Sequence, residues 1–556
     1  MKYLKFLIVV LFFTQSALTQ IKTLDRAYVP AVQKTTTAPL WNLTINEWTA
    51  FRYDAATDTW TAIPFQFDQM NENGDRIDRD ASGITDISDE VIFLPTDAGD
   101  QANATDWLDD ENSKQSERIE IEVTDPLDPS KKAWVYLYKN IATDANVPGY
   151  LSYTAGPSET PAADTVATSA FTLGHNQEGW IDYLKFANGN QDIIDRFKLR
   201  IKGDGILTPA YEINEDYVEA STADDAVIFT NGPVRAFHTI KADILLKKLG
   251  MPLLPDKAAF AYDFEYTPYA FGIYAEAKDL KADLLSVFGV QIIRQSLDFN
   301  SNADGMIFYS EFNGEGVLID GEVTEYDEQV KQDSPQNWVM ATGDLGTVFV
   351  IFETSLMKNS KRILHFRDNK SNPYTLDGTE DTGDMHSYGD MGIMIEATGS
   401  ALIPEYLSIN YKGYFIDQPN AGYEFGKRLL AWEQNPLELE ARLQTFNPSF
   451  VSRDNFLAPQ SFSLHSAYPN PYSKTSAQGI QFEFSGIRNE SYDLIVYNMI
   501  GQQVARFTNL SVDANGQHVL RWDARDARGS ALAPGVYFYQ LDNGVYTQTQ
   551  KLMISR

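Results

Sequence analysis

Short segments in which apolar and polar residues alternate, separated by turn-forming residues, recur along most of this 556-residue chain. A period of two places successive side chains on opposite faces of a β-strand, whereas an amphipathic helix repeats about every 3.6 residues. Helical periodicity is rare here, so the sequence predicts a mainly β protein made of several β-sandwich domains. One predicted strand has a wholly aromatic face, at Phe260, Tyr262, Phe264 and Tyr266. Such a face either stacks on sugar rings or fills a sandwich core.

Charge and composition divide the chain into parts. Residues 1–19 carry two positive charges and residues 460–556 carry eight Lys/Arg against seven Asp/Glu, so residues 20–459 must carry −35 to give the formal net charge of −32. A stretch rich in Pro, Gly, Ser, Thr and Ala separates two β-rich regions. We therefore predict a signal peptide at 1–19, an N-terminal β-rich domain at 20–145, a linker or long loop at 146–168, a central β-rich sandwich domain at 169–455 and a small C-terminal domain at 460–556.

Two short helices are expected inside the central domain. Apolar residues recur every four positions between 280 and 292, and residues 437–443 follow Pro436, which is a favourable start for a helix. No internal repeat of fixed period is visible, so a solenoid is not predicted.

The N-terminus has the pattern of a secretory signal peptide. Lys2 and Lys5 precede an apolar run at 6–13. The small residues Ala17 and Thr19 occupy positions −3 and −1 of a predicted cleavage site before Gln20. The run is much shorter than the roughly 20 residues of a membrane-spanning helix. The alternatives are a buried strand or a membrane anchor. We expect export through the Sec machinery and no transmembrane segment in the mature chain.

The last hundred residues predict a small antiparallel, immunoglobulin-like β-sandwich. Five alternating segments lie close together and are separated by turns, at 480–484, 492–497, 518–522, 536–541 and 547–554. Turn motifs punctuate them in a fixed order: Tyr-Pro-Asn-Pro-Tyr at 468–472, Tyr-Asn-Met-Ile-Gly-Gln at 497–502, Trp-Asp-Ala-Arg-Asp at 522–526 before a glycine, Ala-Pro-Gly-Val-Tyr-Phe-Tyr at 533–539 and Lys-Leu-Met-Ile at 551–554.

This arrangement resembles the type A C-terminal sorting domain of type IX secretion system (Por secretion) cargo in Bacteroidota. The motif residues that carry the resemblance are Pro469, Asn470, Pro471, Gly501, Trp522, Asp523, Gly529, Gly535, Tyr537 and Lys551. The resemblance implies passage through the periplasm, recognition by the outer-membrane translocon and cleavage by its sorting-domain peptidase. The product is then secreted or attached to the outer cell surface. An adhesion-type sandwich without a sorting role is the alternative.

Composition excludes several chemistries for the body. The chain contains no cysteine, which removes disulfides, thiol nucleophiles and metal–thiolate sites. Its strongly acidic body gives no electrostatic footprint for nucleic acid. The six histidines are scattered along the chain, so a histidine-rich metal site is not expected. The segments 63–68, 89–93 and 97–100 are similar to exported bacterial proteins of unassigned function, a resemblance that carries no activity.

The strongest metal candidate is a calcium loop at 300–311. Its spacing follows the pattern in which alternate oxygen side chains face one ion and a final carboxylate closes the shell. The predicted ligands are Asn300, Asn302, Asp304 and Glu311. Asn300 replaces the usual first aspartate, and a strand rather than a helix is expected to follow, so a hairpin turn is the alternative. Two further acidic segments, 71–80 and 377–390, offer calcium ligands or a polar surface. The cationic segment 362–370 offers partners for an anionic sugar or carboxylate, or forms ordinary salt bridges with the acidic body.

No catalytic residue is assigned from the sequence, because the motifs of common hydrolases, nucleotide-binding proteins and zinc proteases are absent. We expect a secreted or cell-surface protein whose body is a binding or structural component. The alternative is a carbohydrate-active enzyme or glycan-binding module. A carboxylate pair for glycoside chemistry is a spatial feature, so spacing along the sequence cannot find it.

Overall fold

The computed structural model describes residues 20–555 apart from 37–38, 71–82, 142–146, 206–209, 222–226, 251–255, 277–288, 326–329, 331–333, 335, 355–359, 372–386, 399–407, 447–462, 474–478, 487–490, 500–501, 514–516, 527–528 and 544–546. These residues form seven β-sheets and one α-helix, which confirms the mainly β fold class. Among them, no helix has the length and apolar character needed to cross a bilayer. The signal peptide, the acidic segment 71–80 and residues 280–288 of the helix expected at 280–292 lie outside the described residues. Residues 290–292 belong to the strand β19 (Val290–Phe299), so the expected helix does not extend to its predicted end.

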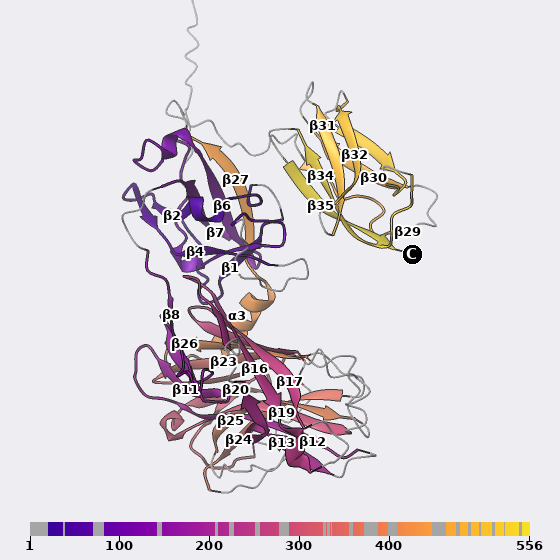
Figure 1. The fold of residues 1–556 in the computed structure, drawn as a ribbon. Helices are drawn as coiled ribbons and strands as arrows, with labels where there is room; N and C mark the ends of the chain where they lie inside the picture. Colours follow the sequence, from indigo (N-terminus) through magenta and orange to yellow (C-terminus); the bar gives the residue numbers. More distant parts are fainter. Residues whose placement is uncertain are drawn as a thin grey trace, which may run out of the picture.

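Two sheets pack together near the N-terminus (Figure 1). The first has the order β1 (Ala31–Lys34), β5 (Glu90–Phe93) and β4 (Phe65–Asp68). The second has the order β27 (Glu438–Thr445), β6 (Glu117–Asp125), β7 (Asp128–Lys139), β2 (Trp48–Asp54) and β3 (Thr59–Ala62). Side chains from both inner faces, including Phe93, Ile121 and Val135, share one core. We call this pair of sheets the N-terminal unit.

The central unit comprises three sheets. A four-stranded sheet has the order β11 (Ile181–Phe186), β10 (Phe171–His175), β9 (Thr165–Thr168) and β8 (Leu151–Thr154). A five-stranded sheet has the order β13 (Tyr211–Asn214), β12 (Ile194–Gly203), β19 (Val290–Phe299), β25 (Ser387–Ala397) and β24 (Ser360–Asn369).

The third sheet of the central unit has ten strands. Its order is β14 (Val218–Ala220), β16 (Ala236–Ile244), β17 (Ala258–Tyr266), β18 (Ala270–Glu276), β26 (Ser408–Ile416), β23 (Gly346–Thr354), β22 (Trp338–Gly343), β20 (Ile307–Ser310) and β21 (Asn313–Leu318), with β15 (Val227–Thr230) also paired to β16. One face packs on the other two sheets of the unit, and residues of all three sheets, such as Leu173, Phe197 and Tyr262, form a continuous core. The helix α3 (Tyr423–Gln434) packs on the opposite face through Phe425 and Leu429.

Two segments differ from the sequence-based expectation. Residues 146–168, expected as a linker or long loop, contain the strands β8 and β9, because β9 pairs with β10 and β8 pairs with β9. Residues 437–443, expected as a helix, form β27 in the N-terminal unit. Pairing with the free edge of β6 outweighs the weak local preference for a helix.

The C-terminal domain is a sandwich of two sheets. One has the order β28 (Ser463–Leu464), β30 (Ile480–Ser485) and β33 (Gln517–Trp522). The other has the order β29 (Tyr472–Ser473), β35 (Thr547–Ser555), β34 (Gly535–Asp542), β31 (Tyr492–Asn498) and β32 (Gln503–Leu510), with only the short β29–β35 pair parallel. The five strands predicted from alternation are present. The strand β32 was not predicted, because its mostly exposed side chains do not alternate regularly.

Candidate functional site

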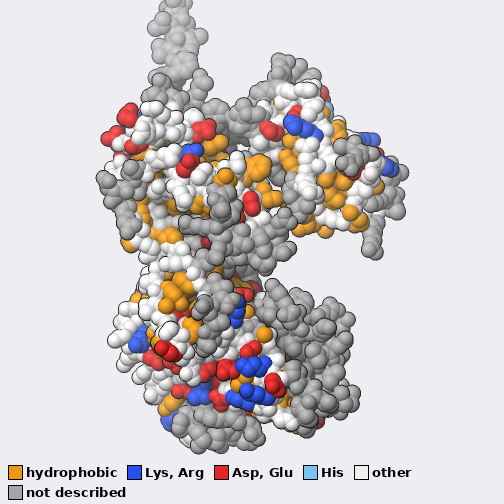
Figure 2. Space-filling model, in the orientation of Figure 1, with side chains coloured by type: hydrophobic (Ala, Val, Ile, Leu, Met, Phe, Trp, Pro, Cys, Tyr) orange, Lys and Arg blue, Asp and Glu red, His pale blue; other side chains and the backbone are white. Residues whose placement is uncertain are grey.

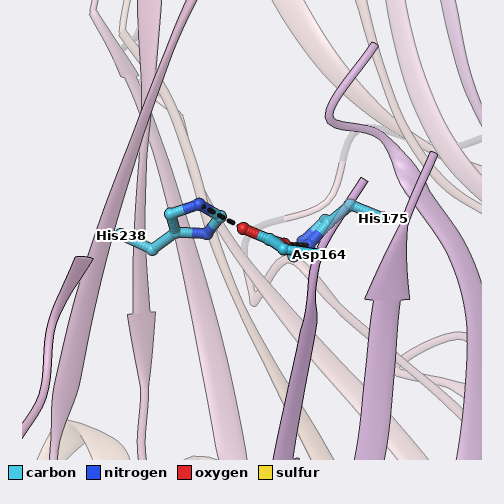
Figure 3. Close-up of side chains that lie close together, drawn as sticks. All are labelled: Asp164, His175 and His238. Carbon is cyan, nitrogen blue, oxygen red and sulfur yellow. Dashed lines mark hydrogen bonds and ion pairs between the residues drawn. The ribbon is translucent and has the colours of Figure 1, made fainter. Parts of the chain in front are cut away.

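Three ionisable side chains from separate elements meet in the interior of the central unit (Figure 3). Asp164 directly precedes β9 and His175 ends β10, and the hairpin register brings them together because the His175 amide donates to the Asp164 carbonyl at 2.9 Å. His238 lies on β16, where alternate residues are buried against the neighbouring sheet. The relative exposures of Asp164, His175 and His238 are 2%, 4% and 1%. We call these three residues the Asp–His–His cluster.

The carboxylate of Asp164 lies between the two imidazoles. His175 Nδ1 is 2.7 Å from Asp164 Oδ1, and His238 Nε2 is 2.9 Å from Oδ2. Tyr153 donates its hydroxyl hydrogen to Oδ2 at 2.9 Å, and the Tyr266 hydroxyl is 3.1 Å from His175 Nε2. The contact of His238 Nε2 lacks the geometry of a hydrogen bond, and His238 Nδ1 has no hydrogen-bond partner among the described residues.

Aromatic rings surround the Asp–His–His cluster. The Phe264 ring centre is 5.1 Å from that of His175 and 5.6 Å from that of His238, and Tyr153 stacks on Phe229 at 3.8 Å. The aromatic face predicted from the sequence therefore lines this interior, since Tyr262, Phe264 and Tyr266 are all buried. The side chain of Phe260 lies outside the described part. For the three described rings, core packing is the correct interpretation and exposed sugar stacking is not.

Burial and neighbouring groups shift the pKa values of Asp164 and His238 in opposite directions. Burial raises the pKa of Asp164, but its contacts with His175 and His238 outweigh burial and hold the pKa of this carboxyl below its usual range. Burial lowers the pKa of His238, while the neighbouring Asp164 acts the other way. At neutral pH the cluster therefore presents an ionised carboxylate beside a neutral His238 ring.

A second polar cluster lies on the five-stranded sheet, on four adjacent strands. Lys198 Nζ is 2.8 Å from Asp298 Oδ2 and 3.7 Å from Asp390 Oδ2, and His365 Nε2 is 3.2 Å from Asp390 Oδ2. Burial raises the pKa of Asp390, but Lys198 and His365 lower it well below its usual range. The structure thus pairs His365 of the cationic segment 362–370 with Asp390 of the acidic segment 377–390, of which residues 377–386 lie outside the described part.

The predicted calcium ligands lie in the turn between β19 and β20. Asn300 Oδ1 accepts from the Asn302 amide at 2.8 Å, and its Nδ2 donates to the carbonyls of Asp192 and Ile194 at 3.0 Å. Asn302 Nδ2 also donates to the Asp192 carbonyl, at 2.7 Å.

The remaining two predicted ligands have different surroundings. Asp304 is exposed at the end of the short 3-10 turn Ser301–Ala303. The Glu311 carboxylate accepts from the Ser334 hydroxyl and from the amide of Asn337 at 3.2 Å. The calcium site stays a prediction, and among the described residues the Asp–His–His cluster alone brings three His, Cys, Asp or Glu ligand atoms within 4.8 Å of one another.

The sorting-domain motif residues hold turns and strand ends. Asn470 donates to the Lys551 carbonyl at 2.8 Å and accepts from the Met553 amide at 2.8 Å, which fastens the entry segment to β35. Trp522 is buried and its Nε1 donates to the Arg525 carbonyl at 3.0 Å. Tyr537 is buried in the core of the domain, and its hydroxyl donates to the Ala533 carbonyl at 2.8 Å. The remaining motif positions lie in turns, at a strand start or on an exposed strand face: Pro469, Pro471, Asp523, Gly529, Gly535 and Lys551, with Gly501 outside the described residues.

The surface of the C-terminal domain differs from that of the central unit. Several large apolar side chains of this domain are exposed, and Figure 2 shows apolar side chains spread over its visible face. They include Tyr468, Met499, Val519, Phe538 and Met553. On the visible face of the central unit, acidic and basic side chains are intermixed.

The fold and motifs of the last 90 residues define a class of exported protein. Residues 466–555 match the family described as the secretion system C-terminal sorting domain, so this segment is a Por secretion (type IX) sorting domain. The chain is a cargo protein of the type IX secretion system, directed to the outer surface or the medium. The match covers the C-terminal domain and leaves the body unassigned.

Comparisons of the rest of the chain give only distant likenesses. No curated protein matches it by sequence. Among solved structures it is similar to a polysaccharide lyase, at 7% identity and a TM-score of 0.20 over 74% of this chain. It is also similar to PorZ of Porphyromonas gingivalis, at 10% identity and a TM-score of 0.14, over 77% of this chain and 77% of PorZ. A third similar structure is latent PorU of the same organism, at 11% identity and a TM-score of 0.14, over 76% of this chain and 35% of PorU. The chain spans about half, 47%, of the lyase. TM-scores this low carry no argument about fold or activity.

The sequence did not predict the Asp–His–His cluster. Asp164 and His175 are 11 residues apart, but His238 lies 63 residues beyond His175, and no short motif joins the three. The one local indication is that His238 occupies a buried position in an alternating strand between Ala236 and Ile240. Fold topology, rather than spacing along the chain, creates this cluster.

Proposed function

We propose that the body of this cargo protein is a binding or structural component that works at the cell surface or in the medium without catalysing a reaction. The observation that carries the proposal is the burial of the aromatic face of β17, because these rings fill the interior between sheets instead of lining an open groove. Exposed rings on a groove are the usual platform for sugar faces, and buried rings stabilise the fold.

The buried ionisable groups of the central unit support the same proposal. A glycosidase needs two carboxyl groups roughly 5 to 10 Å apart that face the substrate. In the described part, Asp164 is buried against His175 and His238, while Asp298 and Asp390 are buried beside Lys198. Because all three are buried within the fold, these carboxylates have no access to a polysaccharide.

One cavity inside the central unit is too small to hold a sugar. It lies between sheets and is lined mainly by aromatic and aliphatic side chains, including Phe197, Phe271, Phe352, Tyr411 and Phe415. Its volume of about 20 Å³ is close to that of a single water position and is far smaller than a sugar ring.

A polysaccharide screen tests the proposal for the body. The purified chain from residue 20 to 556 is incubated with neutral and anionic polysaccharides, with and without calcium, and both binding and released saccharides are measured. We expect no released product above that of the heat-unfolded chain. Saturable binding would identify the component as a glycan binder, whereas catalytic release of saccharides would overturn the proposal in favour of a carbohydrate-active enzyme.

A truncation tests the handling of the chain by the translocon and its peptidase. A chain that ends at residue 459 keeps β27 but lacks the sorting domain, so we expect it to accumulate in the periplasm of a host with a functional type IX system. The Arg442→Met variant of the full chain, which changes one exposed side chain of β27, serves as the matched control and is expected to be exported. Normal export of the truncated chain would contradict the assignment.

A further inference from the structure

The Asp–His–His cluster has the donor set of a transition-metal site. Two imidazole nitrogens and one carboxylate, each from a different segment, lie within 4.8 Å of one another. We propose that Asp164, His175 and His238 bind one zinc-type divalent metal ion, which fastens the four-stranded sheet to the ten-stranded sheet of the central unit. This site is independent of whether the body binds a glycan, so the two proposals fail separately.

Ligand chemistry favours zinc over calcium or magnesium. Zinc accepts imidazole and carboxylate ligands together, while calcium and magnesium take oxygen ligands almost exclusively. Two of the three donors here are nitrogen atoms, so the site differs in kind from the predicted calcium loop at 300–311. The Tyr153 hydroxyl, 2.9 Å from Asp164 Oδ2, is a nearby further oxygen.

The hydroxyl groups of Tyr153 and Tyr266 contact the proposed ligands as outer hydrogen-bond partners do in metal sites. Metal-bound histidines usually engage their second nitrogen in a hydrogen bond, which fixes the ring orientation. The Tyr266 hydroxyl does this at His175 Nε2, at 3.1 Å, and leaves Nδ1 facing the cluster. Tyr153 orients the Asp164 carboxylate in the same way. Both tyrosines therefore hold ligands in place from outside the cluster.

The His238 ring supplies the second, independent observation. It is only 1% exposed, and neither of its ring nitrogens makes a hydrogen bond among the described residues, although Nε2 lies 2.9 Å from Asp164. A buried polar group without a hydrogen bond is costly. A metal ion bound by this ring satisfies a nitrogen that otherwise makes no hydrogen bond among the described residues.

The position of the cluster indicates a structural metal. Its residues are buried beneath aromatic rings, which leaves no described route for substrate, and structural zinc sites are closed in this way. The chain has no cysteine and therefore no disulfide. A metal that joins β9, β10 and β16 supplies a cross-link between sheets that an exported protein otherwise gains from cystine.

Metal loading of the full chain is the direct test. The purified chain is loaded with zinc, freed of unbound metal by gel filtration and assayed for metal content, and a cobalt-loaded sample is examined for the visible absorption of low-symmetry Co²⁺. We expect one ion per chain and a cobalt spectrum. His175→Gln and His238→Gln should abolish both, while His365→Gln, which alters a buried histidine–aspartate pair with no second histidine, should retain both.

Thermal unfolding gives a second readout. Removal of metal should lower the melting temperature of the wild-type chain, zinc should restore it and calcium should not, because only a ligand of the native state shifts unfolding. Tyr153→Phe keeps all three ligands and should weaken zinc binding about tenfold, which tests the site even if the histidine variants fail to fold. A wild-type chain that takes up no zinc, or equal zinc in wild type and a folded His238→Gln, meaning an adventitious ion only, overturns the proposal.

Discussion

Asp368 shows how burial and hydrogen bonding compete at a single residue of the central unit. Its carboxylate is 1% exposed and accepts the backbone amides of Asp320, Gly321 and Gly389 at 2.8 to 3.0 Å. These bonds favour the ionised form, but burial acts more strongly and raises the pKa of Asp368 to about 6. The native state therefore binds a proton near pH 5 that the unfolded chain releases.

The pH dependence of stability should reveal this carboxyl. Because the folded pKa lies above the unfolded value of 3.8, the contribution of Asp368 to stability is fully present below about pH 4 and is lost as the pH rises to 6. Relative to Asp368→Asn, the wild-type chain should lose about 3 kcal/mol between pH 4 and pH 7. Chemical denaturation of both proteins across this range measures the difference. A difference that stays constant with pH would contradict the assignment.

The backbone of the neighbouring strand β19 leaves no room for a side chain at position 392, which is a glycine. A Cβ at this position in β25 would lie 2.1 Å from the Gln295 carbonyl oxygen and 2.6 Å from Ser296 Cα in β19. Gly392→Ala should therefore force the two strands apart and lower the free energy of unfolding by about 1–3 kcal/mol. Gly189→Ala is the matched control, since the nearest atom is 3.8 Å away, and should change stability by less than about 0.5 kcal/mol. Equal stability of the two variants would refute the steric argument.

At the scale of elements, α3 ends on a buried arginine. Arg26 Nη1 donates to the carbonyls of Trp432 at 3.2 Å and Asn435 at 2.5 Å, and its Nε donates to Asp125 at 2.9 Å. The last carbonyls of a helix have no partner within the helix and attract positive charge. Arg26 thereby joins the start of the chain, the β6–β7 turn and the end of α3.

Loss of this arginine should be strongly destabilising. Arg26→Met leaves Asp125 buried without its counter-ion, so we expect the free energy of unfolding to fall by about 3–5 kcal/mol. Arg442→Met removes a cation from an exposed pair with Glu440 and should cost less than about 1 kcal/mol. Denaturant titrations of the two variants provide the comparison. If Arg26→Met were as stable as Arg442→Met, the role given to the buried pair would be wrong.

Sequence patterns predicted some elements well and others not at all. The strands of the sorting domain have one polar and one buried face, so alternation identifies them, as in the Ile480–Ser485 strand. The helix α3 was missed because Gly426 interrupts its pattern, and that glycine is present because the Trp338 ring would lie only 3.1 Å from a Cβ. Residues 438–445 carry no local indication that their partner β6 lies far back in the sequence.

The candidate site was beyond the reach of sequence patterns for a similar reason. The predicted calcium ligands are neighbours along the chain, and local spacing is what a loop motif measures. Asp164 and His238 are 74 residues apart and meet only because two sheets of the central unit pack face to face. Counting charges along the sequence places a division near residue 460 without any information about tertiary contacts. In the structure this division lies between the end of β27 at Thr445 and the first strand of the sorting domain at Ser463.

At the scale of the whole molecule, one guanidinium links the N-terminal and central units. Arg235 Nε is 2.7 Å from Asp68 on β4, its Nη2 is 2.7 Å from Glu90 on β5, and its Nη1 is 3.4 Å from Glu265 on β17. Burial lowers the pKa of Arg235, but the three carboxylates raise it further than burial lowers it. Gln66 adds to the junction by accepting the Arg235 amide at 2.9 Å.

Removal of this guanidinium should uncouple the two units. Arg235→Met removes the guanidinium that three carboxylates share, so we expect a loss of about 3–5 kcal/mol and separate unfolding of the N-terminal unit. We expect calorimetry to resolve two transitions for this variant and one for the body of the wild-type chain. Lys257→Met, which removes an exposed cation near Glu219 and Asp243, should leave the unfolding profile unchanged. A single unshifted transition for Arg235→Met would contradict the coupling.

The pairing of β27 with β6 also sets the order in which the molecule can be finished. A growing chain leaves the ribosome N-terminus first. The edge of β6 (Glu117–Asp125) nevertheless pairs with β27, which begins more than 300 residues later at Glu438. The first unit to be made is thus among the last to be completed. Because β27 ends at Thr445 and the sorting domain begins its first strand at Ser463, nearly the whole chain must be available before the N-terminal unit can be completed.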